Sequence, residues 1–420
     1  MTALQGSPLD KEKTGLDSCV HCGFCLQACP TYIALEDENE SPRGRLLLMG
    51  ALLEGTVAPD DAEVGRHLDQ CLGCRGCETA CPAGVPYGRL LEATRATLIE
   101  HRPLPFLARL VLGIFARPWA LRLALWGARI LRASGLASLL GRVLPARVAM
   151  PFAMLASTAR PAPRRDAAAA MQSRGGATLL TGCVMEGLLP SVNRATERVL
   201  ARQGWTVHAT EGQRCCGALH AHAGDAVGAR ALARANIAAF ERPGDSTIVM
   251  NSAGCGAMCK EYGHLLADDP PWSARANAFA ARVRDVHELL VPLAPAAAQA
   301  PSRRVAYDAP CHLQHGQRIV DQPTALLSSI PAITMVLLAD SDQCCGSAGI
   351  FNLIRPEVAE RVLAPKLARI TESGAEVVAT GNPGCLMQIG GGLVRTGSLV
   401  VARHPVELLD DAYASDQRPR

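Results

Sequence analysis

The sequence predicts a multi-domain α+β protein, with a helical N-terminal module followed by two duplicated α/β domains. Three observations lead to this prediction. The 420 residues are enough for two or three domains, each with a core of its own. The 17 cysteines fall into two groups, separated by a long cysteine-free segment. The second group repeats one pattern of cysteines, which indicates two copies of one fold.

Composition limits the classes of function. Net charge is only +3, so there is no general electrostatic case for a nucleic-acid partner. An odd number of cysteines cannot be fully paired in disulfides, and the first residues lack the apolar segment of an export signal. We therefore expect reduced thiols in a cytoplasmic protein, and metal or redox chemistry rather than a disulfide scaffold.

The first segment, residues 1–100, contains one cysteine motif twice. Each copy has three cysteines at intervals of three residues and a fourth directly before proline: Cys19, Cys22, Cys25 and Cys29, then Cys71, Cys74, Cys77 and Cys81. This is the spacing of bacterial ferredoxins, in which the fourth cysteine of each run serves the other cluster. Two zinc sites are the alternative, but structural zinc usually takes pairs of ligands separated by a longer loop.

We therefore predict a dicluster ferredoxin domain over residues 1–100. One [4Fe–4S] cluster is assigned to Cys19, Cys22, Cys25 and Cys81, and the other to Cys71, Cys74, Cys77 and Cys29. Thiolate-bound clusters pass single electrons and carry no group that activates an organic substrate. We expect an electron carrier and assign no catalytic residue.

The second segment, residues 101–172, is rich in arginine and has no acidic residue between Glu100 and Asp166. Its apolar periodicity over residues 107–143 predicts amphipathic helices with a cationic face. Such a face could lie on an anionic membrane or an acidic partner, or the helices could be a brace with solvated arginines. No stretch reaches 18 uncharged apolar residues, so we expect no transmembrane span. Residues 160–170 are predicted to be a linker.

The third and fourth segments, residues 173–298 and 299–420, are the two copies. Their cysteines match at near-constant offsets: Cys183, Cys215, Cys216 and Cys255 in the first, and Cys311, Cys344, Cys345 and Cys385 in the second. Short β-branched runs over residues 247–250 and 376–380 alternate with helical stretches over 192–202 and 358–370. This alternation predicts α/β units. We call them the first and second Cys-Cys-Gly domains.

These domains offer thiols for a further metal site. Adjacent cysteines are poor disulfide partners for each other but can hold a metal from two directions. The first domain offers five, Cys183, Cys215, Cys216, Cys255 and Cys259, and the second offers four, Cys311, Cys344, Cys345 and Cys385. A further iron–sulfur site, a zinc site and a scaffold without metal all stay open. His312 and His315 could be auxiliary ligands, proton carriers or polar residues near a helix start.

Taken together, the motifs closely resemble the iron–sulfur subunit of bacterial glycolate oxidase over nearly the whole chain. The resemblance lies in Cys19-Val-His-Cys-Gly-Phe-Cys, Ser41-Pro-Arg-Gly-Arg45, the run from His67 to Val85, and the two Cys-Cys-Gly domains. The Cys-Cys-Gly pattern is shared more widely, with the anaerobic glycerol-3-phosphate dehydrogenase C subunit, lactate-utilisation proteins and the heterodisulfide reductase B subunit.

The resemblance implies a glycolate dehydrogenase complex in which separate FAD-containing subunits oxidise glycolate to glyoxylate. FAD would be present only on those partners. This chain would pass the electrons to a membrane quinone-type acceptor, as a peripheral protein on the cytoplasmic face of the inner membrane. One alternative is a related lactate or glycerol-3-phosphate dehydrogenase complex, and another is a heterodisulfide-reductase-like enzyme that acts on disulfides. In a third, the two Cys-Cys-Gly domains serve only as an interaction scaffold.

The resemblance also implies that a Cys-Cys-Gly domain can hold a non-cubane [4Fe–4S] cluster on five cysteines. Only the first domain has five. Even there, Cys255 and Cys259 are one residue further apart than in heterodisulfide reductase. The second domain has Leu386, Met387 and Gln388 where another cysteine would fall.

Overall fold

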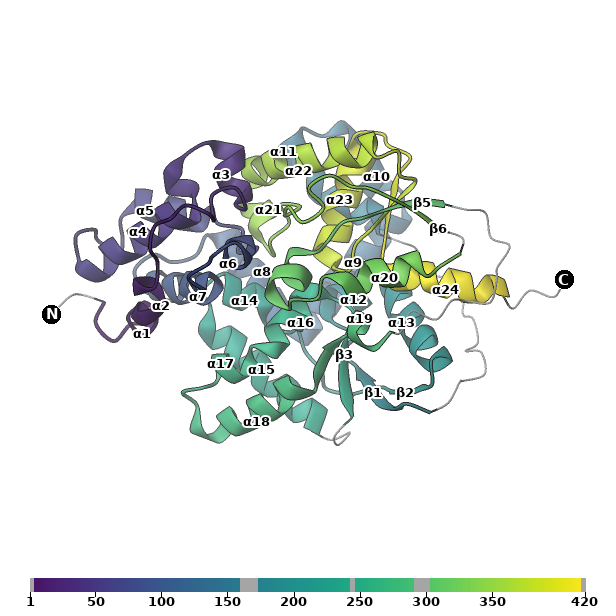
Figure 1. The fold of residues 1–420 in the computed structure, drawn as a ribbon, viewed down its shortest axis with the longest axis horizontal. Coiled ribbons are helices and arrows are strands. Elements are labelled where there is room, and N and C mark those ends of the chain that lie inside the picture. Colours follow the sequence, from purple (N-terminus) through teal and green to yellow (C-terminus); the bar gives the residue numbers. More distant parts are fainter. Residues whose placement is uncertain (1–3, 159–172, 242–245, 291–302, 332, 417–420) are drawn as a thin grey trace.

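A computed structural model describes residues 4–158, 173–241, 246–290, 303–331 and 333–416. The chain forms a helical N-terminal module, a set of connecting helices and two α/β domains (Figure 1). The predicted fold class is therefore confirmed. The linker predicted over residues 160–170 lies outside the described residues.

The N-terminal module consists of short helices joined by the loops that carry the cysteines. Leu9, Met49, Leu68 and Leu90 are fully buried in its core. The helices are α1 (Pro8–Lys11), α2 (Lys13–Asp17), α3 (Pro30–Leu35), η1 (Glu38–Glu40), α4 (Pro42–Glu54), α5 (Ala62–Asp69), α6 (Gly76–Thr79) and α7 (Tyr87–Leu98).

The start of α4 explains why Ser41-Pro-Arg-Gly-Arg45 has this sequence. The Ser41 hydroxyl accepts a hydrogen bond from the backbone N–H of Gly44 and caps the helix, and proline at the first helical position fits because its missing N–H would have no partner there. A Cβ at Gly44 would lie 2.1 Å from the Glu38 carbonyl oxygen, so this position excludes a side chain. The close approach places the next residue, Arg45, in the interior of the module.

Each Cys-Cys-Gly domain is built on a four-stranded parallel sheet. The strand orders are β2-β1-β3-β4 in the first domain and β6-β5-β7-β8 in the second. The strands are β1 (Gly175–Leu179), β2 (Trp205–His208), β3 (Thr247–Met250), β4 (Val283–Asp285), β5 (Arg303–Tyr307), β6 (Ile333–Val336), β7 (Val377–Ala379) and β8 (Val401–Arg403). Parallel strands all end at one edge, where open α/β sheets bind their ligands.

The helices of these domains follow the strands as the sequence predicts. Those of the first domain are α12 (Cys183–Leu188), α13 (Pro190–Arg202), α14 (Ala218–His222), α15 (Ala226–Glu241), α16 (Ala253–Lys260), α17 (Tyr262–Leu265), α18 (Pro270–Arg282) and α19 (Val286–Leu289). Those of the second are η2 (His312–Gly316), α20 (Asp321–Ser328), α21 (Phe351–Ile354), α22 (Pro356–Glu372), α23 (Pro383–Arg395) and α24 (Pro405–Asp416).

The two domains form one body. Helix α24, at the end of the second domain, packs against α13 of the first, and one buried cluster of apolar side chains draws on both sheets. An ion pair between Arg198 and Asp410, at 2.6 Å, links the two helices. The Ser191 hydroxyl donates to the Glu407 carboxylate at 2.9 Å in the same interface.

The connecting helices are α8 (Phe106–Ala116), α9 (Pro118–Ala133), α10 (Leu136–Val143) and α11 (Ala146–Ser157). Helices α10 and α11 pack against α23, and α9 packs against α12. Among the described residues no single helix is long and apolar enough to cross a membrane. Helices α8 and α9 reach that length and composition only as a pair, which is bent by 106°.

The face of α9 differs from the cationic face that the sequence predicts. Two tryptophans and two aliphatic residues form an exposed stripe along it, with exposed fractions of 49–64%: Trp119, Leu123, Trp126 and Ile130. Arg129, in contrast, is partly engaged by the body, because it donates hydrogen bonds to the carbonyls of Gly187 and Glu186. The connecting helices thus pack against the body and also expose apolar side chains to solvent.

Candidate metal centres

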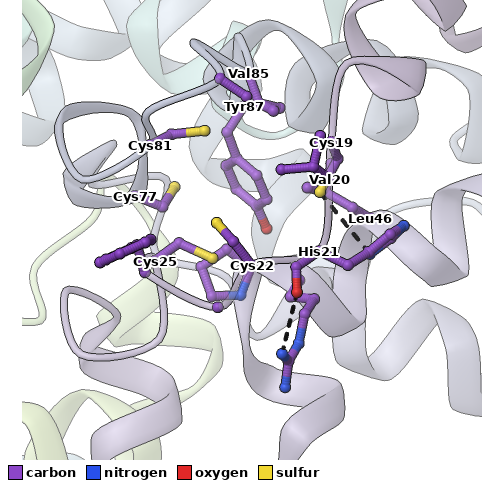
Figure 2. A pocket seen from close by; sticks show the side chains of 15 residues that line it. Cys19, Val20, His21, Cys22, Cys25, Leu46, Cys77, Cys81, Val85 and Tyr87 are labelled. Atoms are coloured by element: carbon purple, nitrogen blue, oxygen red, sulfur yellow. Dashed lines mark hydrogen bonds between the residues drawn. The ribbon is translucent and has the colours of Figure 1, made fainter.

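The first group of thiols lies in a cavity of the N-terminal module. Figure 2 shows the side chains around Tyr87, including those of five cysteines: Cys19, Cys22, Cys25, Cys77 and Cys81. The structure therefore brings Cys81, from the second run, to the first three cysteines of the first run. His21, between two of them, has its ring nitrogen Nδ1 3.9 Å from the Cys19 sulfur.

The second group lies in a neighbouring cavity, whose lining includes Cys29, Cys71, Cys74 and Cys77. Cys29 reaches this group because it has extended backbone geometry before Pro30, the first residue of α3. Cys77 borders both cavities. These are the two sets of four that the spacing predicts, with Cys77 near both.

The thiols of this module fit iron–sulfur ligation. All 17 cysteines are free of disulfides. Burial raises the pKa of Cys25 to about 11 and that of Cys77 well above its usual range, so without a metal these thiols stay protonated. A bound metal takes the place of the proton. A donor set made only of sulfur, in groups of four, suits an iron–sulfur cluster.

A buried cation lies beside the second group. Arg45 is fully buried, pairs with Glu40 at 2.6 Å and donates from Nε to the His67 carbonyl at 2.8 Å. Burial alone would lower the pKa of this guanidinium, but Cys71, Tyr87, Cys29 and Glu40 outweigh it and raise the pKa. Arg45 was not predicted as a site residue from the sequence, although it belongs to the motif Ser41-Pro-Arg-Gly-Arg45 on which the family resemblance partly rests.

Five thiols converge at the carboxyl edge of the first Cys-Cys-Gly sheet. Cys183 begins α12 and lies 3.7 Å from Cys215, sulfur to sulfur, and a hydrogen bond from Cys183 holds the pKa of Cys215 well below its usual range. Cys216 interacts in the same way with Cys255. Cys259 is fully buried in the electrostatic field of Cys255 and Cys215.

The loop around this first set is fixed by polar side chains. The Tyr262 hydroxyl donates to the Cys216 carbonyl at 2.7 Å, and the Asn236 amide donates to the Cys215 carbonyl at 3.0 Å. These bonds hold the adjacent cysteines from both sides. Neither residue was predicted from the sequence, because only the folded chain brings α15 and α17 to the loop.

Four thiols converge at the matching edge of the second sheet. Cys345 and Cys385 lie 3.4 Å apart, and Cys344 interacts with Cys311. The position that corresponds to Cys259 is occupied by Ile389, which is fully buried. This set therefore lacks a fifth thiol of its own.

A buried ion pair distinguishes the second site from the first. Lys366 and Asp308 are paired in the interior, in the electrostatic field of Cys345. The corresponding positions of the first domain hold Asn236 and Leu180, which are both buried and carry no charge. The two sites thus differ in charge as well as in thiol number.

The second group of the N-terminal module contacts the body directly. A hydrogen bond from the Cys344 thiol lowers the pKa of Cys74, so the two cysteine sets are neighbours. The Thr79 hydroxyl lies 2.8 Å from Nδ1 of His315, and Arg75 pairs with Glu261. His315 thus contacts the module rather than a thiol of the body.

His312 is the histidine that lies at the second site, since its Nδ1 is 3.4 Å from the Cys311 sulfur. Its ring also lies 5.2 Å from that of His222, in the first domain. Of the two histidines that the sequence proposes, only His312 touches a predicted ligand.

Comparison with known proteins agrees with this arrangement. Residues 15–85 match the family model of the 4Fe-4S dicluster domain, and residues 177–260 and 305–390 each match that of the cysteine-rich domain. The chain is 36% identical to the probable glycolate oxidase iron-sulfur subunit of Bacillus subtilis, over 94% of this chain and 93% of that protein. It is 33% identical to the glycolate oxidase iron-sulfur subunit of Escherichia coli, over 96% and 95%. Lactate utilization protein A of Exiguobacterium is 33% identical over 56% of this chain.

Proposed function

Since the chain belongs to the family of glycolate oxidase iron–sulfur subunits, we propose that it carries electrons within a flavin-dependent glycolate dehydrogenase complex. It is an iron–sulfur electron-transfer subunit of an oxidoreductase. FAD-containing partner subunits oxidise glycolate to glyoxylate, and this chain passes the electrons to a quinone-type acceptor in the membrane. We assign no catalytic residue to this chain.

The observation that supports this proposal most is that three cysteine sets adjoin one another: the two of the N-terminal module and that of the second Cys-Cys-Gly domain. The first set lies nearest the surface, with Cys22 exposed and Val20 and Phe24 each 69% exposed beside it. The second set shares the border residue Cys77 with the first and contacts the body through Cys74. Electron transfer thus runs from a flavoprotein docked near Phe24, through both cysteine sets of the N-terminal module, to the second Cys-Cys-Gly domain.

The proposed cofactors follow from the thiol sets. Cys19, Cys22, Cys25 and Cys81 hold one [4Fe–4S] cluster, and Cys71, Cys74, Cys77 and Cys29 hold the other. The five thiols of the first Cys-Cys-Gly domain hold a further, non-cubane cluster. The four of the second domain, with Ile389 in the fifth position, receive no such assignment. Clusters of this kind accept and release single electrons when bound.

The connecting helices support peripheral attachment to the cytoplasmic face of the inner membrane. The stripe of Trp119, Leu123, Trp126 and Ile130 is exposed on a segment that has arginines but no acidic residue. Tryptophan and arginine favour the interface of an anionic bilayer. In vesicle flotation we expect the chain to bind anionic but not neutral vesicles, and Trp119→Gln with Trp126→Gln to abolish the binding.

The experiment that tests electron transfer uses the chain purified without oxygen. We expect brown protein whose absorbance near 400 nm bleaches with dithionite. With glycolate, the same bleaching requires the flavoprotein partner, because the chain alone has no group that oxidises the substrate. A colourless preparation that contains zinc, or bleaching by glycolate without any partner, would overturn the proposal.

The 2-hydroxy acid is set by the partner and not by this chain. The lactate utilization relative covers little more than half of the chain, so a lactate-oxidising complex is the second candidate. Supplying purified flavoproteins specific for glycolate or for lactate, and measuring which one bleaches the clusters, separates the two candidates.

A further inference from the structure

A large cavity beside a cysteine set lies between the connecting helices and the first Cys-Cys-Gly domain. It measures about 390 Å³, whereas the two cavities of the N-terminal module measure about 30 and about 10 Å³. Cys183 and Cys215 form part of its lining. A volume of this size admits an organic molecule with a ring system, and the smaller cavities do not.

One wall of the cavity is the inner face of α9. Pro118, Leu121 and Leu125 of this helix line the space, together with Phe115 at the end of α8. They follow helical spacing, and so does the exposed stripe of Trp119, Leu123, Trp126 and Ile130 on another face of the same helix. Helix α9 therefore has the cavity on one side and exposed apolar surface on another.

The rest of the lining includes three arginines. Arg122, Arg129 and Arg214 border the space, and Gln213 adds an amide. The one carboxylate in the lining, Glu186, is already paired with Arg194 at 2.8 Å. An apolar wall bordered by arginines suits a flat apolar ring that carries oxygen atoms and gains negative charge during reaction.

We propose that this cavity binds the ring of a membrane quinone, and that the thiol set at Cys183 and Cys215 is where electrons leave the protein. The inference rests on the proposed function, because it takes from there both the electron supply and the membrane acceptor. It adds the location of the acceptor site and the residues that form it.

At this site a quinone takes up two electrons and two protons and becomes a quinol. Two O–H bonds form, and no group leaves. Iron–sulfur clusters, when bound on the cysteines of this chain, would supply these electrons one at a time after reduction by the flavoprotein. The protons come from water at the open side of the cavity. The cations of Arg122 and Arg214 stabilise the anionic oxygen that forms after the first electron.

The test compares two cavity variants with matched controls in the full chain, purified with its clusters. Leu121→Trp fills the apolar part of the cavity, and Leu399→Trp adds the same side chain at a position that is 97% exposed and outside the lining. Arg122→Gln removes one cation, and Arg361→Gln removes an exposed arginine of α22. Binding of ubiquinone-1 is measured by isothermal titration calorimetry.

We expect Leu121→Trp to weaken ubiquinone-1 binding about tenfold or more, and Arg122→Gln to weaken it about threefold or more, with both controls unchanged. In the complete complex with glycolate, the two cavity variants should also slow ubiquinone-1 reduction while a water-soluble one-electron dye is reduced at the normal rate. Normal ubiquinone-1 binding by both cavity variants would overturn the proposal.

The design separates this inference from the function it rests on. If the wild-type complex reduces ubiquinone-1 and the cavity variants do so equally well, the acceptor site lies elsewhere and the proposed function stands. If the wild-type complex reduces only the soluble dye, the membrane acceptor itself is wrong. Turnover of a disulfide at the cavity, lost in Leu121→Trp, would assign the space to a thiol substrate and would also overturn the quinone proposal.

Discussion

The proline after the fourth cysteine of a run explains why that cysteine joins the set of the other run. Cys29 has extended geometry at φ −96° and ψ 110°, since a residue before proline is disfavoured in helical geometry. Its side chain then faces the Thr31 hydroxyl and the second set, not Cys19. Each run therefore gives three thiols to one set and one thiol to the next.

This exchange predicts the effect of Cys29→Ser. The change should chiefly damage the cluster of Cys71, Cys74 and Cys77, because that set loses its fourth sulfur. Electron paramagnetic resonance of the dithionite-reduced chain should show one [4Fe–4S] signal lost or altered and the other retained. The matched variant Cys81→Ser should alter the other signal. Loss of the same signal in both variants would contradict the assignment.

Arg45 gives a second prediction at the scale of single residues. Arg45→Met should destabilise the chain by roughly 3–5 kcal/mol, because the carboxylate of Glu40 loses its one fully buried cationic partner and keeps only His67 and the more distant Arg66. Urea unfolding followed by circular dichroism measures this loss. The control is Arg43→Met, two residues away, whose exposed ion pair with Glu38 should matter far less. Equal midpoints for the two variants would show that the buried pair does not stabilise the module.

Residue identity and spacing predicted which cysteines could be ligands, but not which polar groups surround them. The eight cysteines of the N-terminal module are typical of clusters by spacing alone. Arg45 and Tyr262 become recognisable only when burial is known, since arginine is mostly exposed in proteins and tyrosine is intermediate. The sequence predicted the candidate ligands, and the structure adds the polar neighbours of these cysteines.

At the scale of elements, α4 shows how a tight approach positions a site. Gly44 lets the helix pack directly on the carbonyl of Glu38, which brings Glu40 and Arg45 into contact. The capping serine and the first-turn proline fix where the helix begins. The geometry of the second cysteine set thus depends on a residue that has no side chain.

Gly44→Ala should therefore be harmful, because its Cβ would lie 2.1 Å from a backbone oxygen that cannot move freely. We expect a loss of roughly 2 kcal/mol or more in urea unfolding, and lower iron content. Gly50→Ala in the same helix is the control, since no atom lies within 4 Å of its added Cβ. That change should be neutral or stabilising by up to about 1 kcal/mol. Equal stability of the two variants would refute the steric argument.

The elements themselves were largely predictable, and their exposure was not. The β-branched run over residues 247–250 coincides with β3, and the stretch over 192–202 lies within α13. Helix α9 was expected to be amphipathic, but it has apolar residues on two faces. Periodicity cannot tell which of two apolar faces a neighbour covers, so the exposed stripe could be found only from the structure.

At the scale of the whole molecule, duplication explains why there are two domains of one fold. Packing between the copies explains why they form one body. The sequence predicted two domains of one fold. It did not predict that α24 of the second would pack on α13 of the first, or that the loop of Cys74 would lie against Cys344. These contacts join residues far apart in the chain, and no local pattern encodes them.

The interface between the domains also buries two histidines. His404 is fully buried, its ring stacks on that of His287 at 5.8 Å, and its Nε2 donates to the Asn251 carbonyl at 3.0 Å. His287 in turn contacts the buried carboxylate of Asp285 at 2.7 Å. Burial, helped by the facing His287, holds the pKa of His404 well below its usual range, so this ring is neutral in the folded protein.

Acid should therefore weaken the body. In the unfolded chain His404 recovers an ordinary pKa near 6.5, so below that pH the unfolded state binds a proton that the folded state does not. The stability that this ring contributes is full above the unfolded pKa and falls as the pH drops below it, by at most about 1.4 kcal/mol per pH unit. Urea unfolding from about pH 7 to about pH 5 should show a shallower decline for His404→Gln than for the wild type, whereas His101→Gln at an exposed position should follow the wild type. A decline equally steep in His404→Gln would mean that the acid sensitivity resides in other groups.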